Sequence, residues 1–173
     1  MNTAPEVSVV LPCLNEALTV GACVKQALKA LAASGLRGEV IVSDNGSSDG
    51  SPELAKKAGA RIVHEPRRGY GSAYLCGIGA ARAPIIIMAD ADNTYDLHEI
   101  PRLVAKLREG YDIVLGSRLG GVILPGAMPW LHRYVGNPIL TGLLNRLFRM
   151  KLQDAHTGSV SYTHLTLPTN REV

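Results

Sequence analysis

The stretch IIIMADADNTYD, residues 85–96, decides which fold class the chain is expected to adopt. It opens with apolar residues that do not alternate with polar ones, which predicts a strand buried on both faces of a sheet. Three aspartates follow it, Asp90, Asp92 and Asp96. Like charges this close repel one another, so we expect a positively charged group to bind at the end of this strand.

Similar short apolar runs recur along the chain, and helical patterns lie between them. Strands are expected at residues 6–11, 39–43, 60–64, 84–89 and 111–115. Helices are expected from Val20 to Leu31, from Ser51 onward, and at 71–82 and 97–109. Ser51 and Asp96 are expected to be helix N-caps. This alternation predicts an α/β fold with a parallel sheet flanked by helices.

The length and composition indicate one globular domain, or one domain with an appendage, without a membrane span. The chain has 173 residues, 46% of them hydrophobic, and no run reaches the roughly 20 apolar residues that cross a bilayer. The N-terminus lacks the basic and apolar pattern of a signal peptide. Three widely spaced cysteines, Cys13, Cys23 and Cys76, indicate reduced packing groups of a cytosolic protein.

Charge is distributed unevenly along the chain, although the net value is only +3. Residues 1–100 hold 9 Lys and Arg against 11 Asp and Glu, whereas residues 101–173 hold 9 against 4. A site that handles a metal and phosphates would use carboxylates from one half and cations from the other. The alternative is a solvated basic face.

Polar residues gather at the ends of three of the expected strands. The segments are PCLNEA (12–17), SDNGSSDGS (43–51) and ADADN (89–93). Each has a simpler explanation by itself, because Asn15 can cap a helix and the second segment can be a turn with Asx hydrogen bonds. Ligands of parallel α/β sheets bind beyond the carboxyl ends of the strands, so the three segments together favour a binding site.

These motifs resemble the successive signatures of family-2 glycosyltransferases with the GT-A fold. The resemblance lies in VSVVLPCLNEA, VIVSDNGSSDGS, RRGYGSAYLCGIGAARAPIIIMADAD and GYDIVLGSR. The later segments GGVILPGAMPWLHRYVGNPILTGLLNRLF and DAHTG resemble the branch that glycosylates polyprenyl phosphates, such as dolichyl- and undecaprenyl-phosphate mannose and glucose synthases. The resemblance implies a Rossmann-like, mostly parallel sheet in one domain. It also implies an inverting transfer from a UDP- or GDP-linked sugar to a polyprenyl phosphate.

The resemblance implies that the aspartates bind a metal ion, Mg²⁺ or Mn²⁺, which would neutralise the departing diphosphate. On extended backbone Asp90 and Asp92 would point to the same side. The family pattern makes Asp92 the direct ligand, with Asp90 acting through water or holding the donor. Asn93 is a further candidate for the metal shell, and Asp96 is left as a helix cap.

The resemblance also implies which residues contact the nucleotide-sugar. They are Pro12, Leu14, Asn15, Glu16, Asp44, Asn45, Gly46, Ser47, Arg68, Gly69, Asp90 and Ala91. Gly69 belongs to a GxG pair, but this pair does not follow a strand tightly enough to be a dinucleotide-binding fingerprint. We interpret it as a loop that passes close to the donor, with Arg68 as a phosphate contact.

The acceptor side is expected to use Arg118, Arg133 and Asp154. A phosphate monoester has a second pKa of about 6, so a lipid phosphate would need no strong general base. The two arginines would hold the phosphate, and Asp154 would orient the acceptor or, with a hydroxyl acceptor, take its proton. The alternative for Arg133 is a position on a surface helix.

Residues 130–151, WLHRYVGNPILTGLLNRLFRMK, can form a basic amphipathic helix. Such a helix can lie on an anionic membrane surface, which would place the protein in the cytoplasm at the inner face of the membrane. The alternative is that its apolar stripe packs on the sheet. Expected partners are thus the donor, the lipid phosphate and a membrane surface, with no nucleic acid.

The resemblance ends near Gly158, so we expect a truncated catalytic domain at 1–158. Residues 159–173, SVSYTHLTLPTNREV, resemble the translated read-through of a sequencing adapter. We interpret them as a non-native tail and expect weak packing there. Two other functions remain open: a family-2 enzyme acting on a saccharide hydroxyl, and a non-catalytic nucleotide-binding fragment.

Overall fold

The computed structural model describes residues 4–116, 137–148 and 160–163. The strands are β1 (Val7–Cys13), β2 (Gly38–Asp44), β3 (Arg61–His64), β4 (Ile85–Met88), β5 (Ile113–Leu115) and β6 (Val160–Thr163). The helices are α1 (Val20–Ala33), α2 (Ser51–Ala58), α3 (Tyr70–Gly79), the 3₁₀ turn η1 (Leu97–Glu99), α4 (Ile100–Arg108) and α5 (Asn137–Phe148). These elements confirm the α/β alternation predicted from the sequence.

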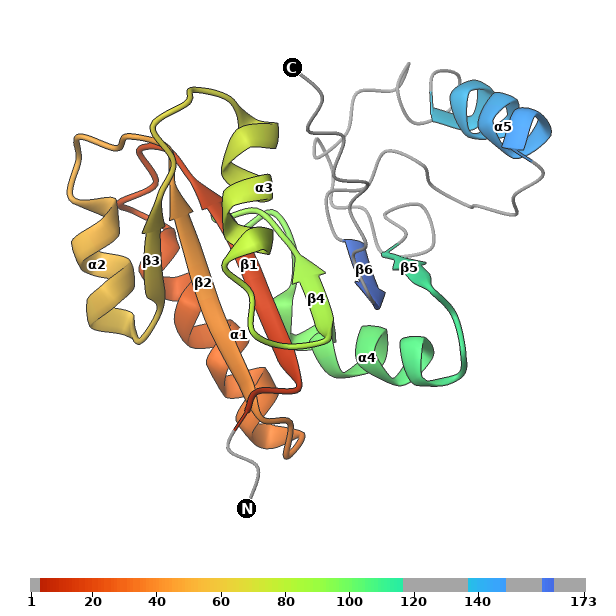
Figure 1. Cartoon of the computed structure of the whole chain (residues 1–173), viewed down its shortest axis with the longest axis horizontal. Coiled ribbons are helices and arrows are strands. Elements are labelled where there is room, and N and C mark those ends of the chain that lie inside the picture. The colour runs from red at the N-terminus through yellow and green to blue at the C-terminus, as the bar shows by residue number, and fades with distance from the viewer. Residues whose placement is uncertain (1–3, 117–136, 149–159, 164–173) are drawn as a thin grey trace, which may run out of the picture.

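The strands form one sheet in the order β3-β2-β1-β4-β6-β5. The first four are parallel, which confirms the predicted parallel sheet. Strand β6 runs antiparallel to both β4 and β5, so β5 has the same direction as β4 (Figure 1). The sequence did not predict this reversed strand inside the sheet.

Strand β6 lies within the segment that was interpreted as a non-native tail. Its four residues pair with Ile85–Met88 of β4 on one side and with β5 on the other. Residues 160–163 thus form a paired strand, and the interpretation of residues 159–173 as a non-native tail stays a prediction. The domain boundary at residue 158 stays a prediction.

Helices cover both faces of the sheet, with α3 on one face and α1 and α4 on the other (Figure 1). The inner strand β1 is buried along its whole length, as expected for a strand covered on both sides. Val9 and Leu11 pack in the core under α1, whereas Val10 packs in the smaller core under α3. Successive side chains of β1 thus point to opposite faces of the sheet and pack into two separate hydrophobic layers.

One glycine allows α3 to approach the sheet closely. A Cβ atom on Gly77 would lie 2.5 Å from Val10 Cγ1 and 3.3 Å from Ser43 Cβ. Real Cβ atoms do not come this near to a neighbouring carbon, so any larger residue would push α3 away. This contact fixes the helix that borders the site described below.

The structure corrects one predicted helix cap and confirms the other. Gly50, with a φ of 85°, holds the N-cap position of α2, and Ser51 is already helical. The Ser51 hydroxyl instead accepts the Glu16 N–H at 2.8 Å. Asp96 caps the next helix as predicted, because its carboxylate accepts the His98 N–H at 2.9 Å.

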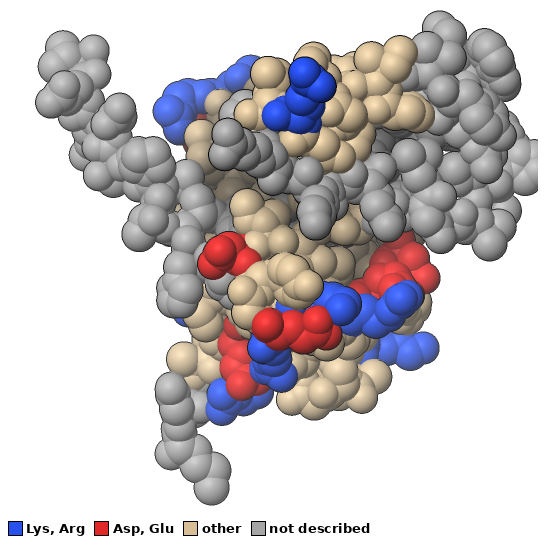
Figure 2. Space-filling view, turned by 90° about the vertical axis from the view of Figure 1, so that its right-hand side faces the viewer, with Lys and Arg blue, Asp and Glu red and all other residues tan. Residues whose placement is uncertain are grey.

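Charges of opposite sign lie next to one another on the face that carries α4 (Figure 2). Arg102 pairs with Glu99 at 2.6 Å and Lys106 pairs with Glu109 at 2.8 Å, and all four side chains are exposed. Exposed pairs of this kind contribute little to stability. In the described ranges, no helix combines the length and apolar character that a membrane crossing requires.

Candidate active site

A cavity of about 350 Å³ opens at the carboxyl ends of β1, β2 and β4. It is lined by Pro12, Cys13, Leu14, Glu16, Asn45, Arg68, Gly69, Tyr70, Ala73, Asp90, Ala91 and Asp92. Most of these residues are those named from the sequence. The strand ends meet there because the strands are parallel, which is the physical basis of the prediction.

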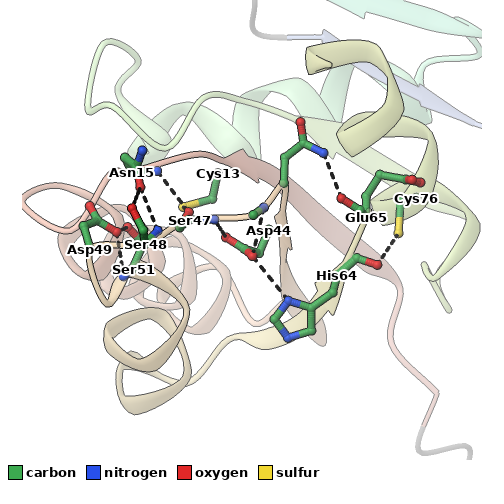
Figure 3. Close-up of polar contacts among 12 residues, drawn as sticks. Cys13, Asn15, Asp44, Ser47, Ser48, Asp49, Ser51, His64, Glu65 and Cys76 are labelled. Carbon is green, nitrogen blue, oxygen red and sulfur yellow. Dashed lines mark hydrogen bonds and ion pairs between the residues drawn. The ribbon is translucent and has the colours of Figure 1, made fainter. Parts of the chain in front are cut away.

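Four residues predicted to contact the donor do not line this cavity: Asn15, Asp44, Gly46 and Ser47. Asp44, Gly46 and Ser47 belong to a turn beside it. Asn15 lies just after β1 and is hydrogen-bonded to this turn (Figure 3). The buried Asp44 carboxylate accepts the N–H groups of Gly46 and Ser47 at 3.2 and 3.1 Å. These contacts are those of an Asx turn, the simpler explanation considered above.

His64 adds a further contact to Asp44, with 3.3 Å between its Nδ1 and the carboxylate. Burial alone would raise the pKa of Asp44. The hydrogen bonds from Ser47, Gly46 and His64 outweigh burial and hold that pKa below its usual value. Asp44 is therefore an anion at neutral pH.

Asn15 connects the end of β1 to the same turn. Its side-chain oxygen accepts the Ser48 N–H at 2.9 Å, and its own N–H donates to Ser47 Oγ at 3.0 Å. Asn15 adopts the left-handed conformation with a φ of 59°. It does not cap a helix, since α1 begins at Val20 after Thr19.

Asn45 holds the loop that precedes α3. Its side-chain nitrogen donates to the carbonyls of Glu65 and Arg67 at 2.9 and 2.8 Å. Its side-chain oxygen accepts the Gly69 N–H at 2.8 Å. These three bonds use the Asn45 amide to position the loop that carries Arg68. Asn45 also lines the cavity, and its contact with the nucleotide-sugar stays a prediction.

Arg68 brings a positive charge to the cavity. Its guanidinium lies over Gly46, where a Cβ atom would be 3.4 Å from Arg68 Cζ. The neighbouring Arg67 is paired with Glu65 at 3.0 Å, whereas Arg68 has no ion pair with any described residue. An exposed guanidinium without a carboxylate partner suits a phosphate ligand.

Asp90 and Asp92 both line the cavity, but not on extended backbone as predicted. Strand β4 ends at Met88, and residues 91–93 form a bend. The pairing of β4 with β1 ends at Val10 and Met88, and the Ala89 N–H still donates to the Val10 carbonyl at 3.2 Å before the chain turns. Asn93 takes a φ of 64° as the chain turns.

The two carboxylates have different hydrogen-bond partners. Asp92 Oδ1 accepts the Thr94 N–H at 2.9 Å, and its Oδ2 has no partner among the described residues. Asp90 Oδ1 accepts the hydroxyls of Tyr70 and Tyr74 at 2.6 and 3.2 Å. Sequence reasoning missed both tyrosines, because the helix was expected at 71–82 and Tyr70 lay outside it. In α3, which begins at Tyr70, the two stand four residues apart and share a face.

Both tyrosines are held as hydrogen-bond donors. Burial and the neighbouring Asp90 carboxylate raise the pKa of Tyr70 to about 12. Burial and the Tyr70 hydroxyl raise the pKa of Tyr74 as well. Neither phenol ionises near neutral pH, so each keeps a proton to donate to Asp90.

The carboxylate oxygens at the cavity supply part of the ligand set of a hard divalent cation. In the described part of the chain, no three His, Cys, Asp or Glu side chains gather to form a metal site by themselves. Asp90 and Asp92 do face one cavity, each with a carboxylate oxygen left over. Mg²⁺ and Mn²⁺ accept one or two carboxylates when waters and substrate phosphates supply the remaining ligands.

The residues predicted to serve the acceptor are not placed by the structure. Arg118, Arg133 and Asp154 lie outside the described residues. The acceptor side of the site therefore stays a prediction.

Two carboxylates and an arginine without an ion pair among the described residues lie together at the carboxyl edge of the parallel strands, which is where ligands of α/β proteins bind. The chain belongs to glycosyl transferase family 2, whose family model matches residues 8–166. This match confirms the resemblance found in the motifs and, with it, the GT-A fold.

Curated relatives narrow the similarity further. The chain is 45% identical over 156 residues to the low-salt glycan biosynthesis hexosyltransferase Agl6 of Haloferax volcanii, covering 90% of this chain and 38% of that protein. It is 36% identical over 128 residues to a dolichyl-phosphate hexose transferase of the same organism, covering 73% and 54%. The chain thus spans about half the length of these relatives or less.

Solved structures show the same architecture. Glucosyl-3-phosphoglycerate synthase from Mycobacterium tuberculosis, in complex with Mn²⁺, UDP-glucose and phosphoglyceric acid, superimposes with a TM-score of 0.70. The two sequences are 26% identical, and the similarity covers 92% of this chain and 57% of that one.

Proposed function

We propose that the protein transfers a hexose from a UDP- or GDP-linked sugar to a polyprenyl phosphate, with inversion at the anomeric carbon. The observation that carries the donor half of this proposal is the cavity itself. It gathers Arg68, Asp90 and Asp92 at the carboxyl edge of the sheet in a family-2 glycosyltransferase domain. The acceptor half is supported by similar proteins that are named as dolichyl-phosphate and undecaprenyl-phosphate transferases.

Within the cavity, the donor's diphosphate would lie between Arg68 and the two aspartates. Arg68 would bind phosphate oxygens, since no described carboxylate competes for it. Asp92 would hold Mg²⁺ or Mn²⁺ through its unpartnered Oδ2, with Asp90 beside it. The cation would act as a Lewis acid on the departing diphosphate. The Mn²⁺ and UDP-glucose bound to the mycobacterial synthase support this assignment.

The acceptor assignment follows the relatives that act on lipid phosphates. One is a dolichyl-phosphate hexose transferase, and another is an undecaprenyl-phosphate 4-deoxy-4-formamido-L-arabinose transferase. In our proposal Arg118 and Arg133 hold the acceptor phosphate and Asp154 orients it. The acceptor oxygen bonds to the anomeric carbon as the bond to the diphosphate oxygen breaks, in a single in-line displacement. The ionised phosphate needs no general base.

Helix α5 supports a position at the cytoplasmic surface of a membrane. Its side chains Ile139, Leu140, Leu143 and Leu147 are exposed, with Arg146 among them. An exposed apolar stripe with a basic residue is typical of helices that lie in an anionic interface. The alternative is that this stripe packs on the sheet.

A second acceptor class has its own support. The mycobacterial synthase is crystallised with phosphoglyceric acid, a small phosphorylated molecule with a free hydroxyl group. With such an acceptor, or with a saccharide hydroxyl, Asp154 would have to accept a proton. The donor half of the proposal would be the same.

Two measurements test these assignments. Calorimetric titration with UDP and with GDP, each with and without Mn²⁺, should show one nucleotide binding in a metal-dependent manner. Transfer assays should then compare undecaprenyl phosphate, phosphoglyceric acid and an oligosaccharide as acceptors. Metal-independent nucleotide binding without transfer would favour the non-catalytic fragment, and a preference for a hydroxyl acceptor would refute the lipid-phosphate assignment.

A further inference from the structure

Two tyrosines of α3 reach across to the aspartate that follows β4. The Tyr70 hydroxyl lies 2.6 Å from Asp90 Oδ1, and the Tyr74 hydroxyl lies 3.2 Å from the same oxygen. The two hydroxyls are 3.4 Å apart, and each has one proton to donate. The shorter distance therefore assigns the Tyr70 proton to Asp90, and Tyr74 donates the second bond.

The tyrosines are themselves fixed by the fold. Tyr74 is only 5% exposed and packs in the core with Val10 and Ile41. The Tyr70 ring meets it edge to face, with 4.9 Å between ring centroids and 84° between ring planes. Tyr70 is 59% exposed and lines the cavity. The core therefore fixes Tyr74, the ring contact with Tyr74 fixes Tyr70, and the Tyr70 hydroxyl holds Asp90.

We propose that Tyr70 and Tyr74 are positioning residues that occupy Asp90 Oδ1 and leave Oδ2 as the single oxygen presented to the bound donor or its metal. This inference rests on the proposed function. Asp90 Oδ1 already accepts two hydrogen bonds from hydroxyl groups, which use the lone pairs that a cation would need. Asp90 therefore binds through Oδ2 only. The carboxylate plane is set before the ligand arrives, which lowers the entropic cost of binding.

The second support for the inference is the anchoring of the residue before Tyr70. Gly69 donates its N–H to Asn45 Oδ1 at 2.8 Å, and its φ of 136° is one that glycine tolerates. The start of α3 is therefore fixed to the end of β2. The Tyr70 hydroxyl cannot move away from Asp90 without breaking this contact or the ring contact with Tyr74.

The test compares the wild-type chain with the variants Tyr70→Phe and Tyr74→Phe, which remove only a hydroxyl. Tyr111→Phe is the matched control, because Tyr111 is 55% exposed and does not line the cavity. The probe is UDP, and in parallel GDP, titrated calorimetrically in the presence of Mn²⁺. Thermal unfolding of each variant is measured beside it.

We expect Tyr70→Phe to weaken Mn²⁺-dependent nucleotide binding about tenfold, as the loss of a hydrogen bond to a charged group predicts. Its melting temperature should stay close to that of Tyr111→Phe, because Tyr70 is largely exposed. The buried Tyr74→Phe should weaken binding and also lower the melting temperature. Wild-type affinity in Tyr70→Phe would overturn the proposal.

Crystal structures of the wild-type and Tyr70→Phe chains separate this inference from the proposed function. If the wild-type chain binds neither nucleotide, the proposed function fails for this chain, yet the structures still decide the positioning role. We expect the Asp90 carboxylate to turn when the Tyr70 hydroxyl is removed. An unchanged Asp90 side chain in Tyr70→Phe would overturn the inference.

Discussion

Gly69 donates its backbone N–H to the side-chain oxygen of Asn45 over 2.8 Å, which fixes the start of α3 to the end of β2. Asn45 is 4% exposed, so this contact is shielded from water. The same amide donates to two carbonyls of the loop that carries Arg68. One buried side chain therefore sets the position of both the cation and the tyrosine that border the cavity.

Replacing Asn45 should weaken both the fold and the site. Asn45→Ala leaves the Gly69 N–H and two loop carbonyls without their partner, and we expect a loss of about 1–3 kcal/mol in the free energy of unfolding. Asn45→Asp keeps the acceptor for Gly69 and loses both donations, so its loss of nucleotide affinity should be similar. Urea unfolding and calorimetric titration with UDP and GDP check this. Unchanged affinity in Asn45→Asp would mean that the loop does not depend on the amide.

Asp92 is expected to be required for metal-dependent binding. Asp92→Ala removes the carboxylate oxygen that has no partner among the described residues, so Mn²⁺ should no longer increase nucleotide affinity, and transfer should be lost. The matched control is Asp112→Ala, because Asp112 is exposed and does not line the cavity. Unchanged turnover in Asp92→Ala would refute the metal role of this residue.

Glycine 77 should not tolerate a side chain. In Gly77→Ala the new Cβ meets Val10 Cγ1 at 2.5 Å, and we expect a destabilisation of about 1–3 kcal/mol as α3 is pushed from the sheet. Gly79→Ala is the control in the same helix, since no atom lies within 4 Å of its Cβ position. That variant should be neutral or stabilising by up to about 1 kcal/mol. Equal melting temperatures for the two variants would contradict the close contact.

Glu39 should make the free energy of unfolding depend on pH in the acidic range. Burial by itself would raise the Glu39 pKa, but hydrogen bonds from Arg61, Ser8 and the Arg82 N–H lower it below its usual value of 4.5. A carboxyl whose pKa is lower in the folded state stabilises the fold above its unfolded pKa. This contribution is lost as the pH falls from about 4.5 through the folded pKa.

The measurement for Glu39 is urea unfolding between pH 7 and pH 3. Glu39→Gln should be less stable than the wild type at pH 7, and the difference should shrink as the pH falls below about 4. Glu109→Gln is the control, because its pair with Lys106 is exposed and should contribute little. A difference for Glu39→Gln that is constant with pH would show that the charge is not involved.

The exposed leucines of α5 should bind membranes. We expect the chain to float with vesicles that contain anionic lipid, and Leu140→Glu combined with Leu143→Glu should reduce the bound fraction several-fold. Leu18→Glu is the control, because Leu18 is 99% exposed and lies outside α5. If the wild-type chain does not float, the apolar stripe of α5 instead packs against protein.

Much of the fold was predictable because its signals are local. Runs such as Ile85–Met88 identified the strands, and their alternation with helical patterns predicted the parallel sheet that β1 to β4 form. The carboxyl ends of parallel strands share one edge, so the sequence also brought Glu16, Asn45 and Asp92 to one cavity. The motifs by themselves determined the family.

The contacts made inside the site were decided only by the tertiary structure. Asn45 and Gly69 are 24 residues apart, and Tyr70 and Asp90 are 20 apart, so no local pattern reports either hydrogen bond. The antiparallel insertion of β6 between β4 and β5 is likewise a long-range pairing. Sequence periodicity is set by each element's own geometry, whereas these contacts depend on how elements pack against one another.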